Sequence, residues 1–333
     1  MNTGGLDAIL RAMRVMKSSV SVQARGCAAL GNLALVDSMS RATIAAKGGV
    51  DLILDAMRVH SDHGPVQAWG CDALANLSLD VDLQEMITKE GAIEEVLEAM
   101  GRHENNAEVQ QWGCDAMVGL AHGNAENQRE FARRGAIEAV VSAMRNPKLL
   151  KNASFQEKAC RSLAYLAANN MENQKAIAQA GGPEVVLRAK ETHRDVENVQ
   201  EWAVKCLGIL ASDATAILAS MRCFKNNSSV QQWGCNALGH LAHVTSNGCD
   251  DIVNLHGVDT ILSAMKYHEK DVWISLAGCE TIWMLVYQNS KYKQLVGHKH
   301  GVERVLKTMQ NFLGHAPLQK WGCAALVRIV FEA

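Results

Sequence analysis

One motif, written eight times along the chain, restricts the fold more than any other feature. Its clearest copy reads V-Q-A-W-G-C-D-A-L-A-N-L-S and begins at Val66. Within it, apolar or small residues recur three and four positions apart, at Val66, Gly70, Leu74 and Leu77. This is the 3.6-residue period of an amphipathic helix. The other copies begin at Val22, Val109, Phe155, Val199, Val230, Ile274 and Leu318.

The spacing of the copies indicates how these helices are assembled. Successive copies start 44, 43, 46, 44, 31, 44 and 44 residues apart. A period in the low forties is typical of solenoids built from two- or three-helix repeats. A single repeat cannot bury its apolar face alone, so neighbouring repeats stack into one continuous core. Because a solenoid grows in one dimension, we expect the 333 residues to form one domain.

Two further segments precede each copy. A glycine turn opens a second helix, as in Gly48–Met57, because glycine allows a sharp entry. A shorter helical segment comes before the glycine, as in Asn124–Arg134. The predicted repeat is therefore a short helix, a glycine turn, a helix, a loop and a long helix. Several second helices end in a histidine that we expect to complement the helix dipole, namely His60, His103, His193 and His268.

Composition restricts the partners and the compartment. The formal net charge of -2 argues against nucleic acid, which selects basic surfaces. No apolar run is long enough to cross a membrane, and residues 1–10 lack a signal-peptide pattern. We therefore expect a cytoplasmic protein without membrane insertion, and a nuclear location stays open.

The cysteines support a reducing compartment. Stacked helices lie about 8–10 Å apart, whereas a disulfide needs Cα atoms within about 7 Å. Cysteines at one repeated position are therefore predicted to be small buried thiols. Seven of the ten occupy such a position: Cys27, Cys71, Cys114, Cys160, Cys235, Cys279 and Cys323.

With these features, the chain resembles the armadillo repeat family, which includes importin-α and β-catenin. The resemblance covers essentially the whole sequence and rests on the three-helix unit, the glycine turn and the long-helix motif. It implies an all-α, right-handed superhelical armadillo-repeat solenoid whose third helices line a concave groove for extended peptides. The expected units are 1–35 (lacking a first helix), 36–79, 80–122, 123–168, 169–212, 213–243 (lacking a first helix), 244–287 and 288–333.

Two departures from the family pattern matter. The array begins at a second helix and ends on a third helix, and neither end shows the polar cap that solenoids need. We interpret the chain as an excised part of a longer protein, or as one whose ends a partner covers. In addition, the step from Val199 to Val230 is 13 residues short of the usual 44. Residues 214–221 match a second helix, so a first helix has been deleted or its residues are missing from the sequence.

Two rows of the long helix correspond to the family's ligand-binding positions. Counting from the first apolar residue as zero, importin-α places tryptophan at +6 and asparagine at +10. Here only Asn32 and Asn76 remain at +10, and no tryptophan stands at +6. An asparagine amide can bind a peptide N–H and C=O together. The absence of the +6 tryptophans weakens a nuclear-import role.

Tryptophan stands instead at +3, where Arg25, Lys158 and Ala277 interrupt the row. One interpretation places these indoles in the groove, where the tryptophan–aspartate pairs of the second and third repeats would hold a lysine or arginine of a partner by cation–π contact and charge. The other places them between repeats, with the adjacent glycines making room. Both remain open. The candidate groove residues are Asn32, Trp69, Asp72, Asn76, Trp112, Asp115, Arg161, Trp202, Lys205, Trp233, Asn236 and His240.

The charges along this row change sign. Asp72 and Asp115, with the two asparagines, predict an acidic N-terminal third. Arg161 and Lys205 predict a basic middle. We therefore expect a bound segment with basic residues towards one end and acidic residues towards the other.

Enzyme chemistry finds little support. His240 and His243 share a helix face, but no third ligand is spaced for a metal site. Phosphate-binding loops and nucleophile elbows are absent from the sequence. We predict a protein without enzymatic activity, metal or cofactor. Two functions stay open: a scaffold that binds a protein or peptide segment in the groove, and an assembly module that dimerises or polymerises through its uncapped ends.

Overall fold

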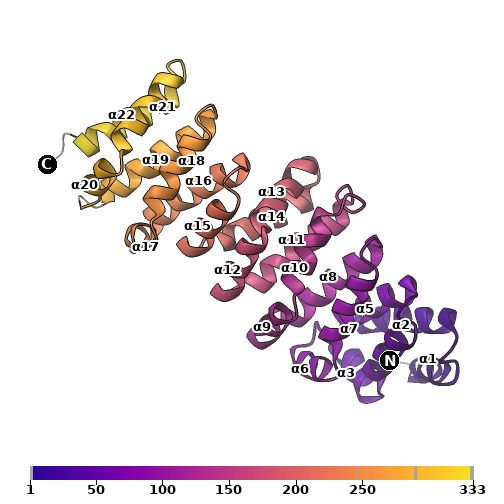
Figure 1. Cartoon of the computed structure of the whole chain (residues 1–333). Helices are drawn as coiled ribbons and strands as arrows, with labels where there is room; N and C mark the ends of the chain where they lie inside the picture. Colours follow the sequence, from indigo (N-terminus) through magenta and orange to yellow (C-terminus); the bar gives the residue numbers. More distant parts are fainter. Residues whose placement is uncertain (1–2, 246, 289–290, 331–333) are drawn as a thin grey trace. The chain divides into compact units, whose positions relative to one another are not determined.

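The computed structural model describes residues 3–245, 247–288 and 291–330, and this part of the chain contains helices and no strands (Figure 1). The predicted all-α class is confirmed for these residues. All eight copies of the motif are long third helices, namely α2 (Val20–Ala34), α5 (Gly64–Leu77), α8 (Ala107–Ala121), α11 (Ala153–Ala167), α14 (Glu197–Leu210), α16 (Ser228–Val244), α19 (Val272–Gln288) and α22 (Ala316–Val330).

The other predicted helices form as well. The second helices are α1 (Thr3–Val15), α4 (Gly49–Val59), α7 (Ala92–Arg102), α10 (Ala136–Arg145), α13 (Gly182–Thr192), α15 (Ala214–Cys223), α18 (Gly257–Tyr267) and α21 (Gly301–Asn311). The first helices are α3 (Ser38–Ala46), α6 (Val81–Lys89), α9 (Ala125–Arg133), α12 (Met171–Ala180), α17 (Gly248–Asn254) and α20 (Lys291–His298). No first helix precedes α1 or α15 among the described residues. The Asp213 side chain caps α15 by accepting from the N–H groups of Thr215 and Ala216.

The chain divides into two compact units, which we describe separately. The first comprises Met1–Ala176 with Arg188–Cys206, and the second comprises Ile177–Leu187 with Leu207–Ala333. In the first unit, α2, α5, α8 and α11 pack successively against one another, with the second helices alongside them. In the second unit, α16, α19 and α22 do the same. The single domain and the right-handed superhelix stay predictions.

The glycine that follows tryptophan in the motif receives a methionine, not the indole. A Cβ on Gly70 would lie 2.5 Å from both Cγ and Sδ of Met57, at the end of α4. The packing interpretation had assigned this space to the neighbouring tryptophans, and the structure corrects it. The same arrangement joins Gly26 to Met13, Gly113 to Met100, Gly234 to Met221, Gly278 to Met265, and Gly322 to Met309.

The turn before the second helix is made by one residue with positive φ. Gly48, Gly91, Gly135 and Gly181 have φ between 76° and 93°. In the last two repeats the predicted turn glycines instead begin their helices, and the preceding histidine takes the left-handed conformation. These are His256 at φ 58° and His300 at φ 59°. The glycine that follows is still required, because a Cβ there would lie within 2.7 Å of the carbonyl oxygen of Ile252 or Val296.

The histidines that end second helices join neighbouring repeats. The Nε2–H of His103 donates to the carbonyl oxygen of Ser61, 2.7 Å away in the preceding repeat. Asparagine amides reach the corresponding carbonyls from Asn146 and Asn311. The helix-dipole prediction therefore missed the main contact of these side chains. The other histidine bonds run from His60 to Lys17, from His193 to Leu150, and from His268 to Lys225.

A glutamine at the second position of the motif joins the second and third helices in every repeat except the seventh. Gln67 Nε2 donates to the carbonyl oxygens of Met57 and His60 at 2.8 and 3.0 Å. Gln67 is 2% exposed, and its bond to Met57 satisfies a carbonyl that α4 leaves unpaired at its C-terminus. The His60 carbonyl also accepts from the His63 N–H, at 2.9 Å. In the seventh repeat Ser275 replaces the glutamine, and its buried Oγ has no hydrogen-bond partner.

Candidate functional site

The tryptophans of the first unit are only partly exposed, so neither the groove interpretation nor the packing interpretation describes them fully. Trp69 on α5 is 39% exposed. Trp112 on α8 and Trp202 on α14 are half-buried. These side chains are therefore neither fully packed nor fully exposed. The third-helix face of the first unit, defined here as the +3, +6 and +10 positions of its third helices, carries a discontinuous aromatic strip.

The tryptophan–aspartate pair on α8 already holds a cation from the chain itself. Lys158 projects from the +3 position of α11, and its Nζ lies 4.5 Å from the centre of the Trp112 ring. The same ammonium forms an ion pair with Asp115. Sequence analysis had offered Trp112 and Asp115 to a cation of a partner, and the structure corrects this because Lys158 occupies that place. The side chains of Lys158 and Asp115 are only 16% and 10% exposed, so water screens the pair weakly.

Two further basic side chains continue the strip. Arg161 Nη2 lies 3.8 Å from Asp115 Oδ1, and its guanidinium carbon lies 5.7 Å from the Trp202 ring centre. Lys205 Nζ lies 4.5 Å from the centre of the same Trp202 ring and forms an ion pair with Glu201 at 2.5 Å. Lys158 and Arg161, both on α11, therefore neutralise the charge of Asp115. The acidic surface predicted for the first third of the chain is correspondingly smaller.

Sequence analysis missed two residues of this strip, Lys158 and Tyr165, and a neighbour of the strip, His122. In the sequence, Lys158 interrupts the tryptophan row. Tyr165, at +10 of α11, lies 5.9 Å from Trp202 between ring centres. His122 contacts Tyr165 edge-on at 5.3 Å. A charge of opposite sign at +3, one repeat after an aspartate at +6, was the sequence signal that would have found Lys158.

Asp72 differs from Asp115 in its surroundings. It is 7% exposed, and its Oδ1 accepts from Asn76 Nδ2 at 3.1 Å. No cation lies within ion-pair distance of it among the residues that the structure describes. Burial raises the pKa of Asp72, the nearby Asp115 raises it further, and the Asn76 hydrogen bond and Lys158 act in the opposite direction.

The two asparagines have different roles. The Asn76 amide nitrogen is engaged within the chain, donating to Asp72 and, at 3.4 Å, to the carbonyl oxygen of Gly31. Of the two groups predicted to bind a peptide backbone, only the amide oxygen of Asn76 therefore remains available. Asn32 on α2 is exposed.

The second unit carries the remaining candidate residues. Trp233 is half-buried and packs against the core of this unit, while Asn236 and His240 are exposed. A separate aromatic cluster lies on α19 and α22, and sequence analysis missed it. Trp283 lies 5.0 Å from Tyr287 in a stacked pair and 4.9 Å from Trp321.

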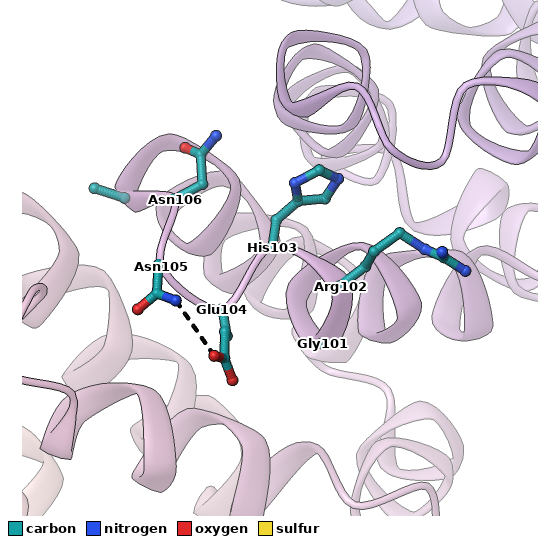
Figure 2. Close-up of a pocket in the computed structure, with 7 residues that line it drawn as sticks. Gly101, Arg102, His103, Glu104, Asn105 and Asn106 are labelled. Atoms are coloured by element: carbon teal, nitrogen blue, oxygen red, sulfur yellow. Dashed lines mark hydrogen bonds between the residues drawn. The ribbon is translucent and has the colours of Figure 1, made fainter.

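A pocket of about 670 Å³ lies at the turn between α7 and α8, and no candidate site residue lines it. Figure 2 shows Glu104 and Asn105 joined by a hydrogen bond across this turn, with His103 pointing away from them. Asn146 of the next repeat also donates to the turn, at Glu104 O and Asn105 Oδ1. These polar groups therefore join repeats.

Metal binding and membrane insertion are two other possible roles for the described residues. These residues contain no group of three or more histidine, cysteine, aspartate or glutamate side chains that could hold a metal ion. No single helix among them is both long and apolar enough to span a membrane. The bent pair α14 and α15 has sufficient length and apolar composition only when the two helices are taken together.

The matching family model is the LRRK2 ARM repeat, which aligns with residues 6–216. The chain belongs to this armadillo-repeat family. The matched residues include both tryptophan–aspartate pairs and Lys158, so these side chains lie within the family's repeats. No curated protein matches the chain.

Solved structures agree on the fold. One engineered protein matches with a TM-score of 0.60 and 22% identity, over 96% of this chain and 78% of that one. A second engineered protein matches with a TM-score of 0.56 and 20% identity, over 85% and 98%. A chain from a study of a phosphorylation switch controlling the interaction between cadherin and β-catenin matches with a TM-score of 0.57 and 14% identity, over 97% and 61%. These identities support the fold alone.

Proposed function

We propose that the chain is a non-enzymatic scaffold whose third-helix face binds an extended or helical segment of another protein. The observation that carries this proposal is the half-exposed tryptophan strip of the first unit. Trp69 is 39% exposed, and Asp72, three positions further along α5, forms an ion pair with none of the described residues. Tryptophan is enriched in the energetically dominant contacts of protein interfaces. Armadillo repeats commonly act as protein-interaction scaffolds, which favours a protein partner over other classes.

The second unit contributes to the same proposed function through its own third-helix face. Trp233, Asn236 and His240 occupy the corresponding positions of α16. Exposed Asn236 and His240 offer hydrogen-bonding groups to a backbone. We propose a cytoplasmic setting, because buried free cysteines suit a reducing compartment.

Site-specific photo-crosslinking tests the proposed face. The photoreactive amino acid p-benzoylphenylalanine replaces Tyr165 in the strip, or Val59, which is 60% exposed on the second helix α4. In cell extract, we expect the probe at 165 to capture a defined segment of a protein and the probe at 59 to capture none. Trp69→Ala should abolish the adduct at 165. Equal capture from both positions, or an adduct that survives Trp69→Ala, would contradict the proposal.

Self-association is the second candidate, and exposed apolar side chains at the α2–α3 connection favour it. Leu35, Val36 and Met39 are 56%, 65% and 75% exposed, and single exposed apolar residues are less informative than such a group. Light scattering at micromolar concentration distinguishes the candidates. Dimers or larger particles that Met39→Lys returns to monomers would support assembly, and a monomeric wild-type chain would contradict it.

A further inference from the structure

Two adjacent repeats contain the same pair of side chains. Trp69 and Asp72 lie three positions apart on α5, and Trp112 and Asp115 lie three positions apart on α8. This spacing places both members of a pair on one helix face. In both pairs the tryptophan is partly exposed, while the aspartate is largely buried, with residue exposures of 7% for Asp72 and 9% for Asp115.

The pair on α8 shows what this arrangement binds. Lys158 brings a positive charge from the next third helix, places it 4.5 Å from the Trp112 ring centre and pairs with Asp115. The ring face attracts the cation through its quadrupole, and the carboxylate supplies the counter-charge. A lysine side chain is therefore the natural occupant of a tryptophan–aspartate pair on this surface.

The pair on α5 lacks such an occupant. The residue that corresponds to Lys158, at +3 of the following third helix, is Trp112. Asp72 accepts one hydrogen bond, from Asn76, and no described cation pairs with it. A carboxylate this buried is unfavourable without a counter-charge. The site therefore has the ring and the buried anion, and it has a second tryptophan where its neighbour has a lysine.

We infer that Trp69 and Asp72 bind a lysine or arginine side chain supplied by the partner segment, as Trp112 and Asp115 bind Lys158. This inference rests on the proposed function and specifies the chemistry of its partner: a segment with a basic residue over α5. Trp69 supplies the exposed ring face, and Trp112 borders the site from the next helix. Asp72 supplies the charge, and Asn76 orients its carboxylate.

The position of Lys158 also explains why this basic residue should be a single one. One repeat further along, the equivalent pair is filled internally, and Arg161 and Lys205 follow it. A second basic residue of the partner, one repeat beyond the first, would meet Lys158 and Arg161. We therefore expect one basic residue over α5 and no further basic residue over α8 and α11.

The test uses the full-length chain and an array of degenerate heptapeptides in which only the central residue is fixed. The four fixed residues are lysine, arginine, norleucine and glutamate, norleucine being an uncharged relative of lysine. We expect the wild-type chain to be retained about tenfold more by lysine or arginine than by norleucine. Asp72→Asn should remove this preference. Glu85→Gln, which removes an exposed carboxylate paired with Lys89 on α6, should keep it.

The outcomes separate this inference from the proposed function. A lysine preference that persists in Asp72→Asn would place the cation elsewhere and overturn the inference. Retention that favours norleucine or glutamate and is lost in Trp69→Ala would also overturn it, while leaving the binding face intact. Retention that does not depend on Trp69 at all would contradict both.

Discussion

Lys158 lies over the ring of Trp112, with 4.5 Å between its ammonium nitrogen and the ring centre, although 46 residues separate the two side chains along the sequence. The contact joins two third helices, α8 and α11, at the surface where the candidate binding strip runs. Because the same ammonium pairs with Asp115, the strip is held together by groups that resemble the ligand it is proposed to bind.

Removing this cation should destabilise the first unit. Lys158→Met leaves Asp115 buried without its main counter-charge, and we expect the free energy of unfolding to fall by about 3 kcal/mol. Urea denaturation measures the loss. Adding Asp115→Asn should recover most of it, because the unpaired charge is then gone. Lys205→Met removes an exposed pair with Glu201 and should change stability by only about 0.5 kcal/mol. Equal losses in the two single variants would contradict the buried-pair account.

Asp72→Asn should make the free chain more stable than the wild type, and this advantage should grow as the pH rises. Burial raises the pKa of Asp72 above its ordinary value of 3.8, so the folded chain binds more protons than the unfolded chain between the two values. The free energy of unfolding therefore falls as the pH rises through the raised pKa. The asparagine variant lacks this loss. Urea denaturation of both chains from acid to neutral pH should show the advantage of the variant growing and then levelling off. A constant difference would show that Asp72 has an ordinary pKa in the fold.

Replacing Ser275 in the seventh repeat should increase the stability of the chain. Ser275 stands where other repeats have a glutamine that donates to two carbonyls, and its Oγ has no hydrogen-bond partner. Ser275→Gln should raise the free energy of unfolding by about 1 kcal/mol, the net value of a typical internal hydrogen bond. The reverse change in a complete repeat, Gln67→Ser, should lower it by at least as much. Thermal unfolding of both variants checks this, and a loss in Ser275→Gln would mean that the seventh repeat has no room for the amide.

The cysteines should divide into two classes by reactivity. The thiolate is the reactive form, and burial raises the pKa of thiols such as Cys27, Cys114 and Cys235 to about 12. Cys223 and Cys323 are exposed, so the prediction of a buried thiol is wrong for Cys323. A disulfide reagent should therefore modify two thiols quickly in the native chain, and all ten after denaturation without reductant. Fewer than ten in the denatured chain would indicate disulfides.

The repeat architecture could be predicted from the sequence, and its lateral contacts could not. The third helices were predictable because their apolar period is local, and every copy became a helix. In the last two repeats the sequence predicted positive φ at the wrong residue. Gly257 is required there because Ile252 approaches it closely, and the positive φ belongs to the preceding His256.

The candidate strip was predictable only in part. Positions on one helix face follow from spacing along that helix, which correctly grouped Trp112 with Asp115. Spacing does not say what the next repeat places above them. In the sequence, Lys158 therefore only interrupts the tryptophan row, although its charge completes the pair one repeat earlier. Similarly, the amide of Asn76 was available to a ligand until the structure placed it on Asp72.

Trp69 tests the central claim better than Trp112 does. Trp112 is covered by Lys158, so its truncation would disturb both stability and binding. Trp69 is 39% exposed, and the two effects can be separated there.

The most direct measurement is therefore the thermal stability of Trp69→Ala together with its affinity for the protein segment captured at position 165. We expect the free energy of unfolding to change by about 1 kcal/mol or less, because much of the ring already contacts water. The affinity should fall by about 2 kcal/mol, or roughly thirtyfold. A loss of about 3–5 kcal/mol in stability, as for a fully packed tryptophan, with unchanged affinity of the folded chain, would contradict the claim that this face binds the partner.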